Sequence, residues 1–300
     1  MLHEHLQALP VQALNGLLFF GIRPRPVVVG DIDLTEIKGE NVDYKGKTAL
    51  ITGASSGIGL AYAEEFARRG TNLILVARRA DLLKAAEKKI SGFSNVKIEL
   101  IEMDLSTLDA GARLVRAVSA KKLQVDFLIN NAGFGTSGRL VKEDRAHIQS
   151  EIVLNVATLV DLTTAYLPGM LKQNFGAIVN IASTASYQPV PGMAVYAATK
   201  AFVRSFTSAV WGEVAGSRVR VLTVSPGATK TEFFEVAGAK PMGSLAPVAN
   251  VVATTFKALE KKRSKPAVID GGGNRLLAGV SSFLPESLVI KVAANMFMPK

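Results

Sequence analysis

Short apolar runs rich in β-forming residues alternate with longer amphipathic stretches along most of the chain. The expected strands are Thr48–Thr52, Asn72–Ala77, Val96–Glu102, Val125–Ile129, Ala177–Ala182, Val219–Ser225 and Pro266–Ile269. After the first strand, residues 60–69 repeat apolar side chains at helical spacing, at Ala61, Ala63, Phe66 and Ala67. Strands that alternate with helices predict an α/β domain built on a doubly wound parallel sheet.

The alternating pattern covers residues 46–272 and leaves an extension at each end. Residues 1–45 contain an apolar stretch, Leu6–Ile22, which Pro10 and several polar residues interrupt. This stretch is too short and too mixed for a convincing membrane span, and it lacks the basic region and cleavage site of a signal peptide. We expect a helix there that packs on the domain or on a partner subunit.

Residues 273–300 form the second extension, which is strongly apolar. Pro285 divides it, so we expect two short amphipathic helices. Packing near the mouth of the functional site or at a subunit interface is the favoured role. Attachment to a membrane surface is the alternative, because apolar helices on a protein of net charge +10 can bind anionic lipid.

The first strand leads into a glycine-rich loop, Gly53-Ala-Ser-Ser-Gly57-Ile-Gly59, which opens the following helix. Glycines let the backbone turn tightly and approach a pyrophosphate, and the helix N-terminus supplies unpaired N–H groups and a positive dipole end. Ser55 and Ser56 can add hydroxyl donors. An ordinary strand-to-helix turn is the alternative, which three glycines at these offsets disfavour. The loop therefore indicates a dinucleotide-binding site.

Tyr196 is followed four residues later by Lys200, and none of the other four of the five tyrosines has a lysine at this offset. On a helix this spacing places both side chains on one face. A neighbouring cation favours the phenolate and lowers the pKa of a phenol from about 10, which suits proton exchange with a carbonyl or alcohol oxygen. Taken alone, such a pair is more often a solvated pair on an amphipathic helix, so its context decides.

The motifs of the chain fall in one order. The loop reads T-G-x-x-x-G-x-G, Asn130-Asn131-Ala132-Gly133 follows the fourth strand, Ser183 follows the fifth, and Pro226-Gly227 follows the sixth. Over residues 46–270 the chain resembles the classical short-chain dehydrogenase/reductase family. The resemblance implies a Rossmann-like fold and an oxidoreductase that uses a nicotinamide dinucleotide.

The resemblance also implies a role for each matching residue. Tyr196 would be the general acid/base, and Lys200 would lower its pKa and hold the nicotinamide ribose. Ser183 would hydrogen-bond the substrate oxygen, and Asn155 would hold a water that links Lys200 to solvent. Besides Tyr196 and Lys200, the expected cofactor-binding residues are Gly53, Ser55, Ser56, Gly57, Ile58, Gly59, Arg78, Asn131, Ala132, Gly133, Pro226 and Gly227, with Asp104 at the adenine and Thr231 at the nicotinamide carboxamide.

The end of the second strand bears on the choice of cofactor. A site for NAD(H) usually places an acid there, which bonds the ribose 2′-hydroxyl. Here Ala77 takes that place, and Arg78 and Arg79 follow. Because a guanidinium binds a 2′-phosphate well, NADP(H) is favoured over NAD(H), with Arg78 as the expected contact. The alternative is that both arginines belong to a solvated loop.

Composition narrows the chemistry. The chain has no cysteine, and its three histidines, His3, His5 and His147, make no metal-ligand pattern, so we expect no thiol chemistry and no catalytic metal. The net charge of +10 favours an anionic cofactor or substrate, and no nucleic-acid motif accompanies it. Three loops, 134–141, 184–193 and 233–245, should shape the substrate site. Their large apolar and aromatic side chains suit an apolar ketone, acyl or steroid-like compound: Phe134, Tyr187, Val190, Met193, Phe233, Phe234 and Met242.

The sequence thus predicts an NADP(H)-dependent oxidoreductase of carbonyl/alcohol pairs. A non-catalytic cofactor-sensing protein on the same fold and a membrane-surface scaffold are the alternatives. The complete Asn, Ser, Tyr and Lys set argues against the first, and the internal motifs argue against the second. Helices near 144–172 and 194–215 carry more apolar surface than one buried face needs, which indicates a homodimer or homotetramer. We expect a cytoplasmic protein, with peripheral membrane contact less favoured.

Overall fold

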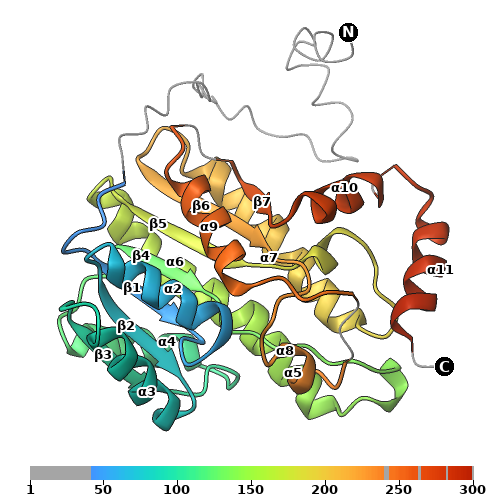
Figure 1. The fold of residues 1–300 in the computed structure, drawn as a ribbon, viewed down its shortest axis with the longest axis horizontal. Helices are drawn as coiled ribbons and strands as arrows, with labels where there is room; N and C mark the ends of the chain where they lie inside the picture. The colour runs from blue at the N-terminus through green and yellow to red at the C-terminus, as the bar shows by residue number, and fades with distance from the viewer. Residues whose placement is uncertain (1–41, 240–242, 263–264, 282, 299–300) are drawn as a thin grey trace, which may run out of the picture. The chain divides into compact units, whose positions relative to one another are not determined.

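The computed structural model describes residues 42–239, 243–262, 265–281 and 283–298. Within them, parallel strands form one sheet in the order β3-β2-β1-β4-β5-β6-β7 (Figure 1). The predicted doubly wound parallel sheet is confirmed, with strand ends within two residues of those expected. The strands are β1 (Thr48–Thr52), β2 (Asn72–Ala77), β3 (Ile98–Glu102), β4 (Phe127–Asn130), β5 (Gly176–Ile181), β6 (Val219–Ser225) and β7 (Ala267–Ile269).

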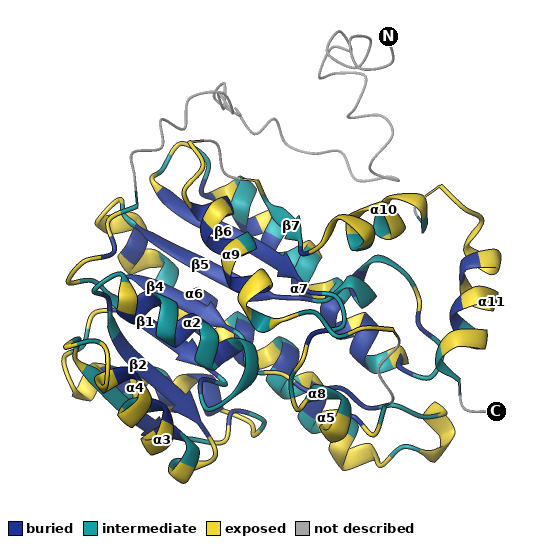
Figure 2. Cartoon of the chain, viewed as in Figure 1, coloured by how far each residue is buried: buried dark blue, intermediate teal, exposed yellow. Residues whose placement is uncertain are grey.

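Helices cover both faces of the sheet, so the inner strands are buried on both sides (Figure 2). One layer holds α2 (Gly57–Arg68), α3 (Ala80–Ser91) and α9 (Val248–Leu259). The other layer holds α4 (Ala110–Ala120), α6 (Leu159–Lys172) and α7 (Ala194–Glu213). The shorter elements are η1 (Leu140–Lys142), α5 (Arg145–Ile152), the π-helical turn η2 (Val153–Thr158), η3 (Thr184–Tyr187) and α8 (Phe233–Val236).

Each layer has its own apolar core. Between the sheet and α2 and α9, the rings of Tyr44, Phe66, Phe127 and Phe256 pack with centroids 5.0–6.1 Å apart. Tilted and edge-on ring pairs of this kind stabilise a core beyond the area they bury. On the opposite face the core is aliphatic and centres on residues such as Leu114 of α4. The two cores fix the sheet between the helices and leave its carboxyl edge free to form a site.

The winding reverses between β1 and β4, because β1 pairs with β2 on one side and with β4 on the other. Ligands of such sheets bind in the crevice at this point. The crevice is held open by hydrogen bonds from Asn131, whose Nδ2 donates to the carbonyl oxygens of Thr52 (2.9 Å) and Gly53 (3.3 Å). The Thr52 hydroxyl oxygen in turn accepts from the backbone N–H groups of Asn131 and Ala132, each at 3.0 Å.

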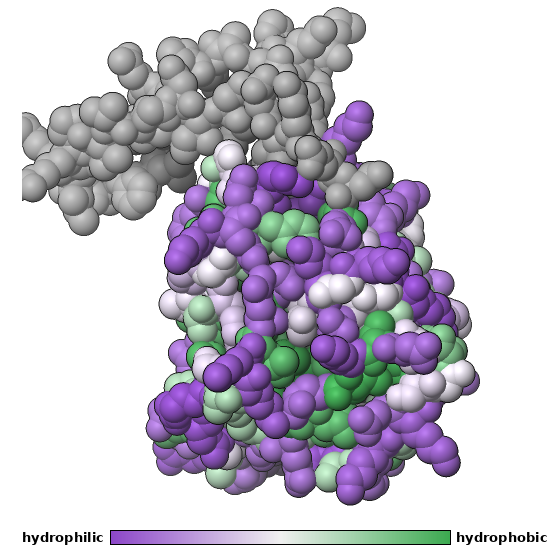
Figure 3. Space-filling model, turned by 90° about the vertical axis from the view of Figure 1, so that its left-hand side faces the viewer, coloured by the Kyte–Doolittle hydropathy of each residue, from purple (hydrophilic) through white to green (hydrophobic). Residues whose placement is uncertain are grey.

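Two helices, α10 (Gly272–Ser281) and α11 (Glu286–Phe297), form the C-terminal segment on either side of Pro285, as the sequence predicts. Both are largely exposed (Figure 2). The helix expected within Leu6–Ile22 lies outside the described residues. The side of the domain away from α10 and α11 is mostly hydrophilic, with apolar side chains gathered in the lower half of the view (Figure 3).

The described residues contain one helical stretch, 145–172, that is long and apolar enough to cross a bilayer, with a mean hydropathy of 1.3. Its α6 part packs against β4 and β5 and buries Leu162 and Met170 in the aliphatic core. It also buries the polar side chains of Asn155 and Thr163. One face of this stretch therefore packs on the sheet, and much of the rest is exposed.

Gly59 approaches the Gly53 backbone too closely for any side chain to fit at position 59. A Cβ on Gly59 would overlap the Gly53 carbonyl oxygen, so Gly59→Ala should lower the free energy of unfolding by about 1–3 kcal/mol. Gly212→Ala, on α7, is the matched control, because nothing lies within 4 Å of a Cβ there. Urea unfolding of both variants checks this. Equal stability of Gly59→Ala and the wild type would contradict the packing described.

Candidate active site

A cleft of about 610 Å³ lies at the carboxyl ends of the strands, within the range of about 300–1,000 Å³ typical of ligand sites. Of the residues predicted from the sequence, Asn155 and Gly59 are buried outside its lining, and the rest line it. The lining members are Gly53, Ser55, Ser56, Gly57, Ile58, Arg78, Asp104, Asn131, Ala132, Gly133, Ser183, Tyr196, Lys200, Pro226, Gly227 and Thr231.

The glycine loop forms one wall of the cleft. Gly53 and Gly57 have φ angles of +65° and +56°, in the left-handed region that favours glycine. Gly59 lies on the Gly53 carbonyl rather than on the cleft, so its role is to let α2 start close to β1. The N-terminus of α2 then faces the cleft, with Ser56 as the N-cap residue. The loop fits the pyrophosphate of a dinucleotide, as the sequence predicts.

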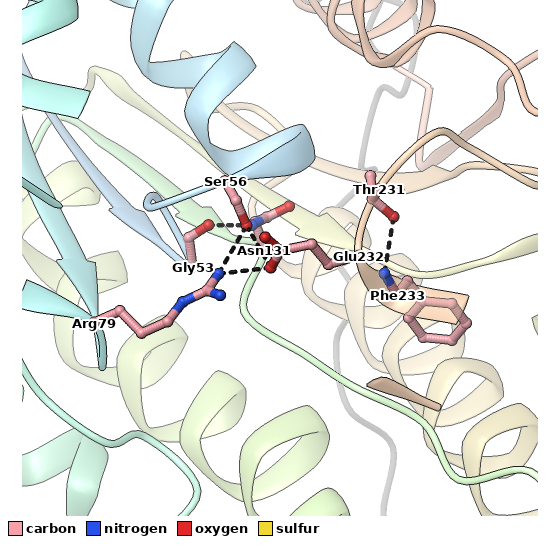
Figure 4. A network of polar contacts seen from close by, with 7 residues as sticks. All are labelled: Gly53, Ser56, Arg79, Asn131, Thr231, Glu232 and Phe233. Atoms are coloured by element: carbon pink, nitrogen blue, oxygen red, sulfur yellow. Dashed lines mark hydrogen bonds and ion pairs between the residues drawn. The ribbon is translucent and has the colours of Figure 1, made fainter. Parts of the chain in front are cut away.

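A polar network crosses the cleft from the β2 end to the segment after β6 (Figure 4). Nη2 of Arg79 lies 2.6 Å from Oε2 of Glu232, and the Ser56 hydroxyl donates to the same oxygen at 3.3 Å. The bond to Arg79 holds the pKa of Glu232 below its ordinary value. Both side chains are about half exposed, 48% and 47%, so the pair contributes only about 0–1 kcal/mol. A bound anion can displace Glu232 from Arg79 at little cost.

Arg78 lies at the same edge but takes no part in this network. Its side chain is exposed and near Asp104, at the end of β3. Partial burial acts to raise the pKa of Asp104. The hydroxyl and backbone N–H of Ser106, and then the charges of Arg78 and Arg113, hold it below the ordinary value. The guanidinium groups of Arg78 and Arg79 thus both border this end of the cleft, and Arg78 is the contact that the sequence predicts.

The other end of the cleft holds Tyr196 and Lys200, both on α7 and only 8% and 5% exposed. Nζ of Lys200 donates to the Ile181 carbonyl oxygen at 2.8 Å and lies 5.8 Å from the centroid of the Tyr196 ring. Ser183 follows β5 and adjoins the phenol through its side chain. The structure therefore brings the three predicted groups together at one buried point.

The protonation of this pair differs from the prediction that Lys200 lowers the pKa of Tyr196. Burial penalises the phenolate and raises the pKa of Tyr196 to about 12, although the hydrogen bond with Ser183 opposes it. Burial also lowers the pKa of Lys200 to about 8. Spacing along a helix reveals the neighbour but not the loss of water around it. At neutral pH Tyr196 is thus a phenol, and Lys200 is mostly an ammonium.

Asn155 lies in the π-helical turn η2, beside this pair. Its Nδ2 donates to the carbonyl oxygen of Phe134 (2.8 Å) and to the Thr199 hydroxyl (3.1 Å), and its Oδ1 accepts from the Phe134 N–H at 3.3 Å. A Cβ on Gly133 would lie 2.9 Å from this Oδ1 and 3.2 Å from Nζ of Lys200. A side chain at position 133 would therefore have to displace the end of Asn155 or of Lys200. Such π-turns often occur at functional sites.

Apolar side chains surround the phenol. The Phe233 ring lies 5.0 Å from that of Tyr196, and Val190 and Met193 pack on the same cluster. Of the predicted substrate-loop residues, Met242 lies outside the described part of the chain and the others line the cleft. Helices α10 and α11 also contribute to the lining of the cleft, through residues that no sequence motif marks: Asn274, Leu277, Ala278, Met296 and Phe297. Only the apolar character of the tail signalled a role there.

No group of three or more His, Cys, Asp or Glu residues within the described ranges is arranged to hold a metal ion. The cleft lining includes glycine backbone, hydroxyl, amide, guanidinium and ammonium groups, together with the carboxylates of Asp104 and Glu232. That set fits a phosphate-containing dinucleotide.

Comparison with known proteins agrees with this geometry. The sequence model of the short chain dehydrogenases matches residues 47–241. The chain belongs to the short-chain dehydrogenase family. It is 37% identical over 186 residues to a sulfoacetaldehyde reductase of Chromohalobacter salexigens, covering 61% of this chain and 73% of that one.

Solved structures of other short-chain dehydrogenases share the fold. One from Sphingobium yanoikuyae, in complex with NADPH, is 34% identical with a TM-score of 0.71, covering 81% of this chain and 94% of that one. One from Burkholderia phymatum, in complex with NAD, is 24% identical with a TM-score of 0.72, covering 80% and 94%. Both nicotinamide dinucleotides therefore occur among proteins of this fold.

Proposed function

We propose that the protein is an NADP(H)-dependent oxidoreductase that interconverts a carbonyl compound and an alcohol. The observation that carries the proposal is the buried Tyr196 phenol, with Lys200 one turn away, at the end of a cleft that fits a dinucleotide. Membership of the short-chain dehydrogenase family and similarity to a reductase support the reaction class.

The residues of the chain would divide the reaction as follows. The cofactor supplies or accepts the hydride when bound, held by the glycine loop, Asn131, Thr231 and Lys200. In the direction of reduction, the Tyr196 phenol donates its proton to the substrate oxygen as that oxygen gains electrons. The Ser183 hydroxyl hydrogen-bonds the same oxygen. The Lys200 ammonium stabilises the phenolate that remains, and this role is assigned to the reacting state. In oxidation the same phenolate takes the proton back.

The substrate end of the cleft favours an apolar carbonyl compound. Its wall includes Phe134, Val190, Met193, Phe233 and Phe297, which offer dispersion contacts and no charge to a ligand. A ketone, acyl or steroid-like substrate suits such a wall, since apolar pockets with few polar groups select apolar ligands.

Replacing Tyr196 by phenylalanine tests the reaction. Tyr196→Phe removes only a hydroxyl, so the fold and cofactor affinity should persist while turnover falls by roughly 10²–10⁴-fold. Steady-state turnover across a panel of apolar ketones, with cofactor binding measured separately, checks this. Tyr166→Phe is the matched control, because the Tyr166 hydroxyl is buried on α6 without a hydrogen-bond partner. Near-normal turnover of Tyr196→Phe would reject the proton transfer.

NADP(H) is the proposed cofactor, because Ala77 stands where an acid would bind the ribose 2′-hydroxyl and two arginines border that end of the cleft. Arg78→Ala should weaken NADPH binding by about 1–3 kcal/mol, much more than NADH binding. Arg79→Ala is the comparison variant, since Arg79 already has Glu232 as a partner. Fluorescence titration of both cofactors decides the matter. Equal losses for NADPH and NADH in Arg78→Ala would rule out its contact with a 2′-phosphate.

A homodimer or homotetramer is proposed as the assembly, through α5, α6 and α7. Three large apolar side chains on these helices stay exposed, namely Ile152 (43%), Leu171 (40%) and Phe202 (42%). The Phe202 ring stacks on that of Phe206 and forms an exposed aromatic surface on which a partner subunit would pack. Light scattering at micromolar protein should report a dimer or tetramer, and Phe202→Glu should shift it toward the monomer. A monomeric wild-type protein would overturn this assembly.

The proposed location is the cytoplasm, with membrane contact through α10 and α11 as a less favoured role. The part these helices play in lining the cleft supports a place at the substrate mouth. A cofactor-sensing protein without catalysis is the second reading, and the buried Tyr196, Lys200 and Asn155 argue against it.

A further inference from the structure

A fully buried carboxylate lies near the catalytic pair and is not explained by the family resemblance. Glu151, on α5, is 0% exposed. Its Oε2 accepts hydrogen bonds from the backbone N–H (3.1 Å) and the hydroxyl (2.9 Å) of Thr136. Its Oε1 is buried without a hydrogen-bond partner. A buried acid with one unsatisfied oxygen destabilises a fold unless a nearby charge compensates it.

The placement of Glu151 links it to Lys200 and Tyr196. Asn155 follows it by one helical turn and so lies on the same side of the helix. The segment after β4 runs along this side. Gly133 lies against Asn155 and Lys200, Gly135 lies against the Tyr196 ring, and Thr136 bonds Glu151. Helix α5 packs on α7, which carries both catalytic side chains. The Glu151 carboxylate is therefore connected to Tyr196 and Lys200 through the segment 133–136.

We propose that Glu151 is a positioning residue, whose buried negative charge balances the Lys200 ammonium beside Tyr196. The inference rests on the proposed function, because it assigns Glu151 a task in that same reaction. A buried ammonium needs an anion nearby when it is far from water, and Glu151 is the buried carboxylate among the described residues on the elements packed around Lys200.

The electrostatic surroundings agree with this role. Burial raises the pKa of Glu151, the hydrogen bonds from Thr136 and the charge of Lys200 oppose that rise, and Glu143 adds to it. The charge of Glu151 in turn opposes the fall in the pKa of Lys200 that burial causes, and it adds to the rise in the pKa of Tyr196. The other titratable side chains on α5 are Arg145 and His147, both exposed, and the His147 ring lies 4.8 Å from that of Phe134.

Removing the negative charge should therefore lower the pKa of both Lys200 and Tyr196. Carbonyl reduction needs Tyr196 as a phenol and Lys200 as an ammonium. A lower pKa of either group therefore moves the alkaline limb of the pH profile in the same direction. In Glu151→Gln the alkaline limb of kcat/KM for reduction should move to lower pH, by about one pH unit. Glutamine keeps the acceptor for Thr136, so the hydrogen bonds alone do not account for such a shift.

Three variants separate charge from structure in pH profiles from about pH 6 to about pH 10. This range includes the pKa of Lys200, which burial lowers to about 8. Glu151→Asp keeps the charge and should restore the wild-type limb, even if turnover falls. Thr136→Val removes a hydrogen bond but no charge and should leave the limb in place. Glu143→Gln removes a charge that is not fully buried and should shift it less than Glu151→Gln. A wild-type limb in Glu151→Gln would overturn the proposal.

A stability cycle tests the same coupling without turnover. Urea unfolding of the wild type, Glu151→Gln, Lys200→Met and the double variant should show that Glu151→Gln costs more when Lys200 is present. If Glu151→Gln does not fold, the double variant should, because it leaves no unbalanced ammonium. Equal costs in both backgrounds, or loss of folding in both, would refute the pairing. A failure of Tyr196→Phe to lose turnover would refute the proposed function alone and leave this cycle unaffected.

Discussion

The ammonium of Lys200 is a charge kept inside the protein, and the site is built around that constraint. Its Nζ donates to the carbonyl oxygen of Ile181, the last residue of β5. Gly133 leaves room beside it, since a Cβ there would lie 3.2 Å from Nζ. Burial then sets the chemistry, because the same loss of water that lowers the pKa of Lys200 to about 8 raises that of Tyr196 to about 12. A neutral phenol next to a cation is a proton donor.

The rest of the cleft follows from the topology. Parallel strands whose order reverses between β1 and β4 leave a crevice at their carboxyl ends, and hydrogen bonds between Asn131 and Thr52 hold its edges. The dinucleotide end is polar and exposed, with Arg78, Arg79 and Glu232 at its rim. The Tyr196 end is lined mostly by apolar side chains, some of them from the C-terminal helices α10 and α11. One cleft thus has a polar, exposed end that suits phosphates and an apolar end that suits the carbonyl substrate of the proposed reaction.

Local patterns were enough to predict the sheet and much of the site. Each strand shows as a short apolar run, and the glycine loop and the spacing of Tyr196 and Lys200 are signals within a few residues. Contacts between distant residues gave no such signal. Glu232 reaches Arg79 across 153 residues, and Phe297 meets the cluster around Tyr196 only through the folded tail. Burial was also invisible, so the sequence pattern did not indicate that burial raises the pKa of Tyr196, and Glu151 was missed.

Transfer of deuterium from labelled cofactor directly tests the proposed hydride transfer to a carbonyl carbon and its dependence on Tyr196. NADPH that carries deuterium at the transferable position of its nicotinamide ring would be incubated with the protein and a panel of apolar ketones, and the alcohols analysed by mass spectrometry and NMR. We expect the wild type to form an alcohol with one deuterium on the carbinol carbon, and Tyr196→Phe to form almost none. Alcohol formed without deuterium, or formed equally by both proteins, would contradict it.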